Sequence, residues 1–291
     1  MIVPGFTGSP LDRADPVRHN ADALAAAMGD WRAKLLKLDN AFVPEVASDG
    51  TLGWTSLADA PPDAELVFLG YIDGKPHFAA YVDGMRAAAG RPTAMFAILD
   101  LMQPAEAGTY AAARSVLDWH SRHQFCAICG QHTAMFRAGW GRLCPACGTE
   151  HFPRTDPVVI MIAEHSGRAL VGRGPGWPEG RYSALAGFLE PGEAIEEAVA
   201  REIFEEAGIR VRNVRYVASQ PWPFPSQLMM ACIGEAEDDV ITIDPNELQD
   251  AMWVSRADVK RALAGDPDAP FASPPRFAIA HTLLTVWADE Q

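Results

Sequence analysis

The sequence predicts an α+β protein whose C-terminal half forms an α/β/α sandwich. Three observations support this: strand-like apolar runs follow residue 156, one acidic helix lies among them, and two Cys-x-x-Cys pairs precede them. Mixed strands and helices favour layered architectures, because each element buries one apolar face against a neighbour. The length of 291 residues fits two or three domains.

The N-terminal block, residues 1–118, contains short strand-like runs and one alanine-rich helical segment. Loops of Pro, Gly and Asp separate them, as these residues favour turns. We expect a separate domain here, without an acidic cluster of the kind described below. The strand-like runs are 33–38, 66–69 and 77–82, and the alanine-rich helical segment at the end of the block is 110–120.

Residues 119–155 carry four cysteines that predict a zinc ribbon. Each Cys-x-x-Cys turn presents two thiolates to one tetrahedral Zn²⁺, and four protein ligands close its coordination sphere. We therefore expect a structural ion, with redox-active pairs or unliganded thiols as the alternative. The fifth cysteine, Cys232, lies in an apolar run and is expected to be a small buried hydrophobe. The four ribbon cysteines are Cys126, Cys129, Cys144 and Cys147.

From residue 156 onward the pattern is rich in strands. The first two runs flank Ser166 and Gly167, so they predict a hairpin with a tight turn. The predicted strands are 158–163, 169–172, 182–189, 211–218 and 228–234, and a closing helix is predicted over 275–288.

The acidic segment 193–207 is expected to form a helix with carboxylates on one face. Pro191 suits a helix start, and Gly208 suits a left-handed C-terminal cap. Three glutamates are spaced i, i+3 and i+4, so they share one face. They are Glu202, Glu205 and Glu206. The apolar positions expected to face inward are Ala194, Ile195, Ala198 and Ile203.

Carboxylates this close repel one another unless a cation neutralises them. Magnesium suits that role, because it takes oxygen ligands and is commonly completed by substrate phosphates. Arg201 follows Glu193 by about two helical turns, so the two side chains can pair and hold the preceding loop onto the helix. An ordinary solvated helix is the alternative for a glutamate-rich run.

A second motif, Ser-Gln-Pro-Trp-Pro-Phe-Pro-Ser-Gln-Leu-Met, occupies residues 219–229. Alternating prolines keep the segment extended and stiff. Trp222 and Phe224 are then expected to stack on a nucleobase or nicotinamide ring, at roughly 1–3 kcal/mol per base. The alternative is a stiff loop whose aromatic rings cap the core.

The bulk composition limits the possible partners. A net charge of −14 argues against nonspecific nucleic-acid binding, which requires many Lys and Arg contacts to phosphate. The N-terminus lacks a basic region followed by an apolar run, and no window approaches the roughly 20 apolar residues of a membrane span. We expect a cytoplasmic protein that does not enter a membrane.

Residues 187–209 resemble the Nudix box, Gly-x5-Glu-x7-Arg-Glu-U-x-Glu-Glu-x-Gly-U with U aliphatic, at every defined position. With the four cysteines before it and Ser-Gln-Pro-Trp-Pro-Phe-Pro after it, the chain resembles the NADH pyrophosphatase branch of the Nudix hydrolases. The likeness extends over the whole chain. It includes Phe6-x4-Leu11-Asp12-Arg13, Phe152-Pro153-Arg154-x-Asp156-Pro157 and Phe277-Ala278-Ile279-Ala280-His281.

The resemblance implies a Nudix α/β/α sandwich at 156–291, a zinc ribbon at 119–155 and an NADH-pyrophosphatase-like, Nudix-like domain at 1–118. It implies hydrolysis of the diphosphate bond of NAD(H) to AMP and nicotinamide mononucleotide, and also removal of NAD caps from RNA 5′ ends. Two or three Mg²⁺ or Mn²⁺ ions, one structural Zn²⁺ per chain and a homodimer are expected. The alternatives are hydrolysis of ADP-ribose or another nucleoside diphosphate, and a noncatalytic nucleotide-binding protein.

The resemblance also assigns roles to individual residues. Glu202 and Glu206 are implied as catalytic metal ligands, with the carbonyl of Ala186 beside them and Glu205 as a further ligand or proton acceptor. Glu247 is the implied distal ligand, although an ordinary exposed loop glutamate is the alternative. Glu193 and Arg201 are implied as structural support.

One departure from the family pattern concerns the substrate wall. The family commonly has Pro-Phe-Pro-x-Ser-Leu-Met, whereas this chain has Ser226 and Gln227 in exchanged order. A specific hydrogen bond from Ser226 to the substrate is therefore in doubt. The implied substrate-binding residues are Phe152, Gln220, Pro221, Trp222, Pro223, Phe224, Pro225, Ser226, Gln227 and Ala280.

Overall fold

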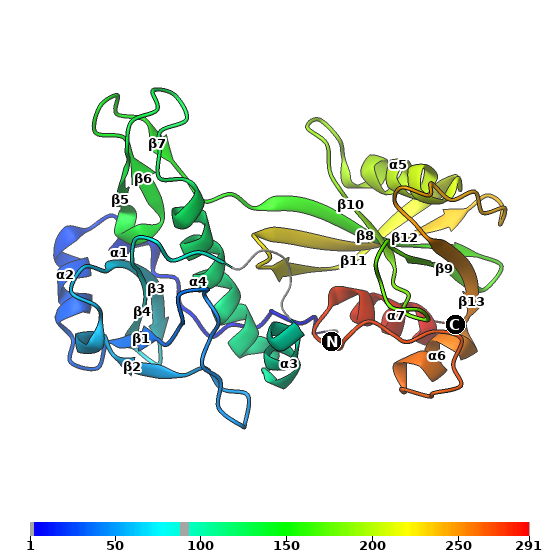
Figure 1. Ribbon diagram of the computed structural model, residues 1–291, viewed down its shortest axis with the longest axis horizontal. Helices are drawn as coiled ribbons and strands as arrows, with labels where there is room; N and C mark the ends of the chain where they lie inside the picture. The colour runs from blue at the N-terminus through cyan, green and yellow to red at the C-terminus, as the bar shows by residue number, and fades with distance from the viewer. Residues whose placement is uncertain (1–2, 88–92, 291) are drawn as a thin grey trace. The chain divides into compact units, whose positions relative to one another are not determined.

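The chain forms two compact units in the computed structural model, which describes residues 3–87 and 93–290 (Figure 1). Unit 1 begins its long continuous part at residue 156, where the sequence predicts the change to a strand-rich pattern. Five residues at the end of β11 and just after it belong to unit 2. Unit 1 comprises Met1–Gly5, Asp156–Pro221 and Gln227–Gln291, and unit 2 comprises Phe6–Thr155 and Trp222–Ser226.

Unit 1 contains a six-stranded mixed sheet in the order β11-β12-β8-β9-β13, with β10 paired to β8. The predicted hairpin joins β8 and β9 through Ser166 and Gly167, whose φ angles of 50° and 75° suit a tight two-residue turn. β11 is longer than predicted. The strands are β8 (Asp156–His165), β9 (Arg168–Arg173), β10 (Leu185–Phe188), β11 (Val211–Trp222), β12 (Gln227–Ala236) and β13 (Asp250–Ser255).

Helices cover both faces of this sheet. Val159 and Met161 of β8 pack in one buried cluster with α5 (Ile195–Ala207), whereas Ile160 and Ile162 pack in another with α6 and α7. Successive residues of a strand point to opposite faces, so the strand pattern itself divides the two cores. The predicted α/β/α sandwich is confirmed (Figure 1). The other two helices are α6 (Arg256–Leu263) and α7 (Ile279–Asp289).

α5 follows the predicted span closely, with one error at its start. Ala198 and Ile203 are buried as expected, but Ala194 is exposed because it is the N-cap residue, one position before the helix. Gly208 ends the helix in the left-handed region, at φ 72°. The Glu197 carboxylate accepts a hydrogen bond from the Ala194 amide at 2.7 Å and so satisfies one unpaired donor of the first turn.

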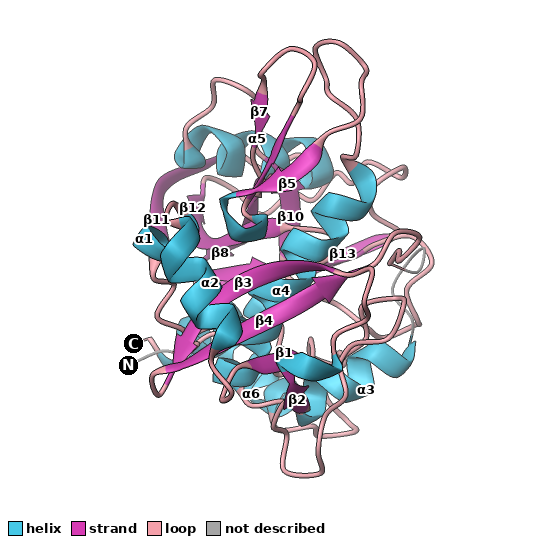
Figure 2. Cartoon of the chain, turned by 90° about the vertical axis from the view of Figure 1, so that its left-hand side faces the viewer, coloured by secondary structure: helices cyan, strands magenta, loops and turns pink. Residues whose placement is uncertain are grey.

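Unit 2 contains a four-stranded sheet in the order β2-β1-β4-β3, against which a long helix, α4, packs through β3 and β4 (Figure 2). The three predicted strand runs correspond to β1, β3 and β4. The elements are α1 (Asp15–Arg18), α2 (Ala21–Gly29), β1 (Lys34–Leu36), β2 (Trp54–Ser56), 3₁₀ helix η1 (Leu57–Asp59), β3 (Glu65–Ile72), β4 (Lys75–Tyr81), α3 (Thr93–Leu101) and α4 (Pro104–Arg122).

The cysteine-rich segment forms a small three-stranded sheet, β5-β6-β7, within unit 2. Trp140 in this segment donates from Nε1 to the Phe68 carbonyl of β3 at 2.7 Å, so the segment is fastened to the N-terminal sheet. Of the helices in the described ranges, none combines the length and apolar character that a membrane crossing requires. The strands are β5 (Ala134–Phe136), β6 (Gly141–Leu143) and β7 (Glu150–His151), with η2 (Arg137–Gly139) after β5.

Candidate active site

Three carboxylates of unit 1 converge on one point. Glu202 and Glu206 lie one turn apart on α5, and Glu247 comes from the segment between β12 and β13. One oxygen from each lies within 4.8 Å of the other two. Glu202 and Glu206 are only 9% and 5% exposed, whereas Glu247 faces solvent. Helical spacing places the first two together, and the return of the chain to α5 brings the third.

Glu205 lies outside this cluster. Its carboxylate is exposed and accepts a hydrogen bond from Arg201 at 2.9 Å, one turn earlier on α5. The i, i+3, i+4 spacing therefore places three glutamates near one another, but only two of them join Glu247.

The protein environment makes the negative charge of the cluster unfavourable. Burial, with smaller contributions from the Glu202 and Glu247 carboxylates, raises the pKa of Glu206 to about 8, although the Ala186 amide opposes this by hydrogen bonding. Burial also raises the pKa of Glu202, against the lowering effect of Arg201. Without a cation, full ionisation of all three groups is disfavoured near neutral pH.

Gly187 on β10 gives the cluster its room. A Cβ atom at this position would lie 1.9 Å from the Glu202 carboxyl carbon and about as close to both oxygens, so any larger residue would displace that carboxylate. Three carboxylates with only oxygen donors, two of them buried, match the ligand preference of a hard divalent cation. The residues present therefore fit the metal that the sequence predicts.

Arg201 ties the loop before α5 to the carboxylate face. Its Nε and Nη2 donate to the two oxygens of Glu193 at 2.6 and 2.9 Å, the pair that the spacing predicts. Nη2 also donates to the Phe188 carbonyl at 2.9 Å, and Nη1 to Glu202 at 2.9 Å. Hydrogen bonds from Arg201 lower the pKa of Glu193 to about 2. One guanidinium thus orients a cluster carboxylate and its neighbouring loop.

Replacing Arg201 with lysine should lower activity without unfolding the protein. Lysine keeps the charge but cannot form the two parallel hydrogen bonds to Glu193. We expect kcat/KM to fall roughly 10- to 100-fold, the range for residues that orient metal ligands. Steady-state kinetics and circular dichroism test this, with the exposed Arg212→Lys as a matched control. Unchanged kinetics for Arg201→Lys would show that the loop holds its position without this contact.

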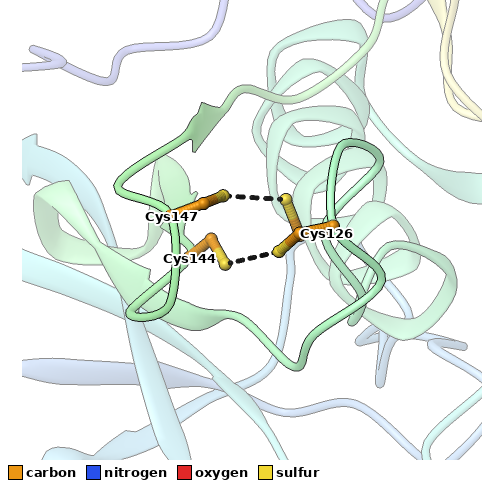
Figure 3. Close-up of side chains that lie close together, drawn as sticks. Cys126, Cys144 and Cys147 are labelled. Atoms are coloured by element: carbon orange, nitrogen blue, oxygen red, sulfur yellow. Dashed lines mark hydrogen bonds between the residues drawn. The ribbon is translucent and has the colours of Figure 1, made fainter.

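The four ribbon cysteines form a second cluster (Figure 3). Their sulfur atoms lie within 4.8 Å of one another, with Sγ–Sγ distances of 3.6 Å for Cys126–Cys147 and 3.5 Å for Cys129–Cys144. A tetrahedral zinc with bonds of about 2.3 Å would hold its sulfurs roughly 3.8 Å apart. The distances are far from the ~2.05 Å of a disulfide. The geometry therefore suits one structural Zn²⁺.

Two neighbours of the ribbon site were not predicted from the sequence. His151 Nε2 lies 3.3 Å from Cys126 Sγ, and Thr149 Oγ1 lies 3.2 Å from Cys147 Sγ. Polar groups that contact metal ligands commonly orient them. Their position just after the second cysteine pair is the only feature of the sequence that could have indicated a contact with the cysteine sulfurs.

A buried network of hydrogen bonds supports the zinc ribbon. Arg142 on β6 donates from Nε and Nη2 to the hydroxyl and carbonyl of Thr133 at 2.7 and 2.6 Å. Its Nη1 lies 3.1 Å from Nδ1 of His120, whose Nε2 lies 2.7 Å from the Gly139 carbonyl. His120 must therefore be neutral, donating from Nε2 and accepting at Nδ1.

This network predicts an acid-sensitive unit 2. Burial lowers the pKa of His120 from 6.5 to about 4. Because the unfolded chain binds a proton at higher pH than the folded chain does, the stabilisation is present above pH 6.5 and is lost as pH falls toward 4. The wild type should lose up to about 1.4 kcal/mol per pH unit more than His120→Gln across this window. Chemical denaturation at several pH values measures the difference, and parallel pH profiles would refute the assignment.

The Pro-aromatic segment is less accessible than the sequence indicates. Trp222 is only 7% exposed and packs edge-on against Phe6 at 5.7 Å and against Phe224 at 5.2 Å, all within unit 2. Most of its ring surface is therefore covered by other side chains of the protein. Phe224 is half-buried, and Phe152 is 48% exposed.

The polar members of the segment make local contacts. Gln220 is buried and donates from Nε2 to the Phe277 carbonyl at 3.1 Å in unit 1. Ser226 donates to the Arg154 carbonyl at 2.8 Å in unit 2, which gives the exchanged serine a structural partner. Of the remaining predicted contact residues, Pro221 is exposed, Pro225 and Gln227 are half-buried, and Pro223 and Ala280 are buried.

The fold and the site together define a class of protein by three features. These are an α/β/α sandwich, a glycine-bounded helix that carries a carboxylate cluster, and a four-cysteine ribbon. Three domain families match successive parts of the chain. They are the NADH pyrophosphatase-like rudimentary NUDIX domain at residues 19–119, the NADH pyrophosphatase zinc ribbon domain at 121–152 and the NUDIX domain at 153–273.

Several known proteins are similar to this chain. The NAD-capped RNA hydrolase NudC of Mycobacterium bovis is 37% identical, over 98% of this chain and 95% of its own length. The human NAD-capped RNA hydrolase NUDT12 is 46% identical over 66% of this chain, which spans 44% of that relative. A NUDIX hydrolase crystal structure from Nitrosomonas europaea superposes with a TM-score of 0.46 and 23% identity, covering 58% of this chain and 92% of that one. The chain belongs to the NADH pyrophosphatase branch of the Nudix family.

Proposed function

We propose that this protein is a metal-dependent hydrolase that cleaves the diphosphate bond of NAD(H), giving AMP and nicotinamide mononucleotide. The convergence of Glu202, Glu206 and Glu247 beside Gly187 carries this proposal, because in a chain of this family such a group of carboxylates can hold a divalent cation. The names of the M. bovis and human relatives support the same cleavage at the NAD cap of RNA.

The catalytic metals are proposed to be two or three Mg²⁺ or Mn²⁺ ions, held by Glu202, Glu206, Glu247 and the carbonyl of Ala186. Bound there, they would neutralise charge on the diphosphate and lower the pKa of the attacking water. We assign Glu205 a ligand or proton-acceptor role although its carboxylate lies outside the cluster, hydrogen-bonded to Arg201. Glu193 and Arg201 keep the loop and Glu202 in place.

The substrate is proposed to be bound by Phe152, by the segment from Gln220 to Gln227 and by the backbone of Ala280. These residues differ in exposure, and we therefore propose different roles for them. Phe152 and Phe224 offer ring surface for stacking, whereas Trp222 and Gln220 support them through the contacts described above.

The domain organisation is proposed as an N-terminal Nudix-like domain at 1–118, a zinc ribbon at 119–155 with one Zn²⁺ per chain, and a catalytic domain at 156–291. The ribbon geometry supports the zinc assignment. A homodimer is proposed from the family resemblance, and analytical ultracentrifugation tests it directly.

The deciding experiment is NADH hydrolysis by the wild-type protein with Mg²⁺ or Mn²⁺, with products resolved by chromatography. Metal-dependent formation of AMP and reduced nicotinamide mononucleotide in equal amounts is expected, and EDTA should abolish it. Parallel assays with NAD⁺, ADP-ribose and NAD-capped RNA rank the substrates. Absence of turnover on all four with either metal would favour a noncatalytic nucleotide-binding protein.

A further inference from the structure

Arg114 of α4 contacts Pro223 and Phe224 of the Pro-aromatic segment, and all three residues belong to unit 2. Its side chain is buried, with the residue 6% exposed. Nη1 donates a hydrogen bond to the Pro223 carbonyl at 2.7 Å. The guanidinium carbon lies 4.6 Å from the centroid of the Phe224 ring. One side chain therefore holds both the backbone and the ring of two consecutive segment residues.

The chemistry of this contact is unusual for a position that only fills space. Within the part of the chain that the structure describes, Arg114 makes no ion pair with a carboxylate, and its Nε is buried without a hydrogen-bond partner. Burying a charged group without a counter-charge is unfavourable, and an apolar side chain of similar length would pack there at lower cost. The Pro223 carbonyl and the Phe224 ring face help to compensate the charge, and the Tyr110 side chain, one turn earlier on α4, also interacts with Arg114.

The contacts of Arg114 fix the orientation of the Phe224 ring. Trp222 packs against that ring at 66° between the ring planes and is itself held by Phe6. Arg114 lies against the same ring and anchors the carbonyl of the residue before it. Loss of Arg114 would leave Phe224 with fewer constraints on its rotation.

We propose that Arg114 is a positioning residue that orders the Trp222–Phe224 segment for substrate binding. This inference rests on the proposed function, in which the segment from Gln220 to Gln227 contacts the dinucleotide. A ring already held in its binding orientation loses little freedom when the substrate arrives, so ordering it beforehand strengthens binding. Removal of Arg114 should therefore raise KM more than it lowers kcat.

Arg114→Met tests this with NADH as the substrate. We expect KM to rise about tenfold, equivalent to ~1.4 kcal/mol, with kcat within about twofold of wild type. Arg114→Lys keeps the charge but loses the planar face, so a smaller rise of about threefold is expected. Arg32→Met, an exposed arginine of the same unit, is the matched control and should leave both constants unchanged. If Arg114→Met does not fold by circular dichroism, Arg114→Lys carries the test.

Combining each variant with Phe224→Leu shows whether Arg114 acts through the ring. We expect Arg114→Met to add little to the KM of Phe224→Leu, because the ring that it orders is then absent. Additive effects, or an unchanged KM in both Arg114 variants beside an active wild type, would overturn the inference. An inactive wild type would instead count against the proposed function.

Discussion

Glu206→Gln should abolish NADH turnover while leaving the fold intact. The amide keeps the size of the side chain but removes the most buried carboxyl group of the cluster, which could otherwise ionise when a cation binds. We expect kcat to fall by more than about 100-fold, beyond the 10- to 100-fold typical of residues that only support metal ligands. The melting temperature without metal should not fall near neutral pH, because the raised pKa of Glu206 keeps its carboxyl largely uncharged there, as the amide also is.

Glu196→Gln is the control for this variant. Glu196 lies in the first turn of α5 and is exposed, outside the carboxylate cluster. Its loss should leave kcat and the metal requirement unchanged. If Glu206→Gln retained a tenth or more of wild-type turnover, the assignment of Glu206 as a metal ligand would be wrong.

Cys144→Ser should release the ribbon zinc and destabilise unit 2. Cys144 is fully buried and belongs to the four-sulfur cluster. Structural zinc sites contribute on the order of 10 kcal/mol in isolated zinc fingers, so losing even part of that free energy lowers stability strongly. We expect zinc content to fall from one equivalent to well below half, and the first melting transition to drop by more than about 10 °C.

Cys232→Ser separates this effect from the loss of any buried thiol. Cys232 is equally buried but packs in the core between the sheet and α5 in unit 1. Its replacement should lower the stability of unit 1 while zinc content, measured by mass spectrometry, stays at one equivalent. Full zinc retention in Cys144→Ser would instead contradict the four-cysteine site.

The predictable parts of the molecule were those encoded locally. α5 was placed closely because its composition, the glycine after it and the spacing of its glutamates all act within a few turns. β13 and α6 were missed, although Ser255 and Asp258 form a capping box that marks the start of α6. Short elements give too few residues for a clear periodic pattern.

The exposure of individual site residues could not be predicted in the same way. Trp222 is buried where Phe6, from near the N-terminus, and Phe224 pack against its ring. Glu205 lies outside the carboxylate cluster, with its carboxylate hydrogen-bonded to Arg201, although its helical spacing from Glu202 equals that expected for a neighbour on one face. The burial of Trp222 and the position of the Glu205 carboxylate both depend on tertiary contacts, and the spacing of residues in the sequence does not predict such contacts.

The five residues Trp222–Ser226 belong to unit 2, although the residues before and after them in the sequence belong to unit 1. This arrangement limits where the chain can be cut into separately folding fragments. A fragment beginning at Asp156 would carry Trp222 and Phe224 but lack Phe6 and Arg114, the residues that cover and anchor them. Those aromatic rings would then face water, and such a fragment should aggregate. The C-terminal half is therefore not expected to function as a separate fragment, and fusion or truncation designs need to retain the chain from Phe6 onward.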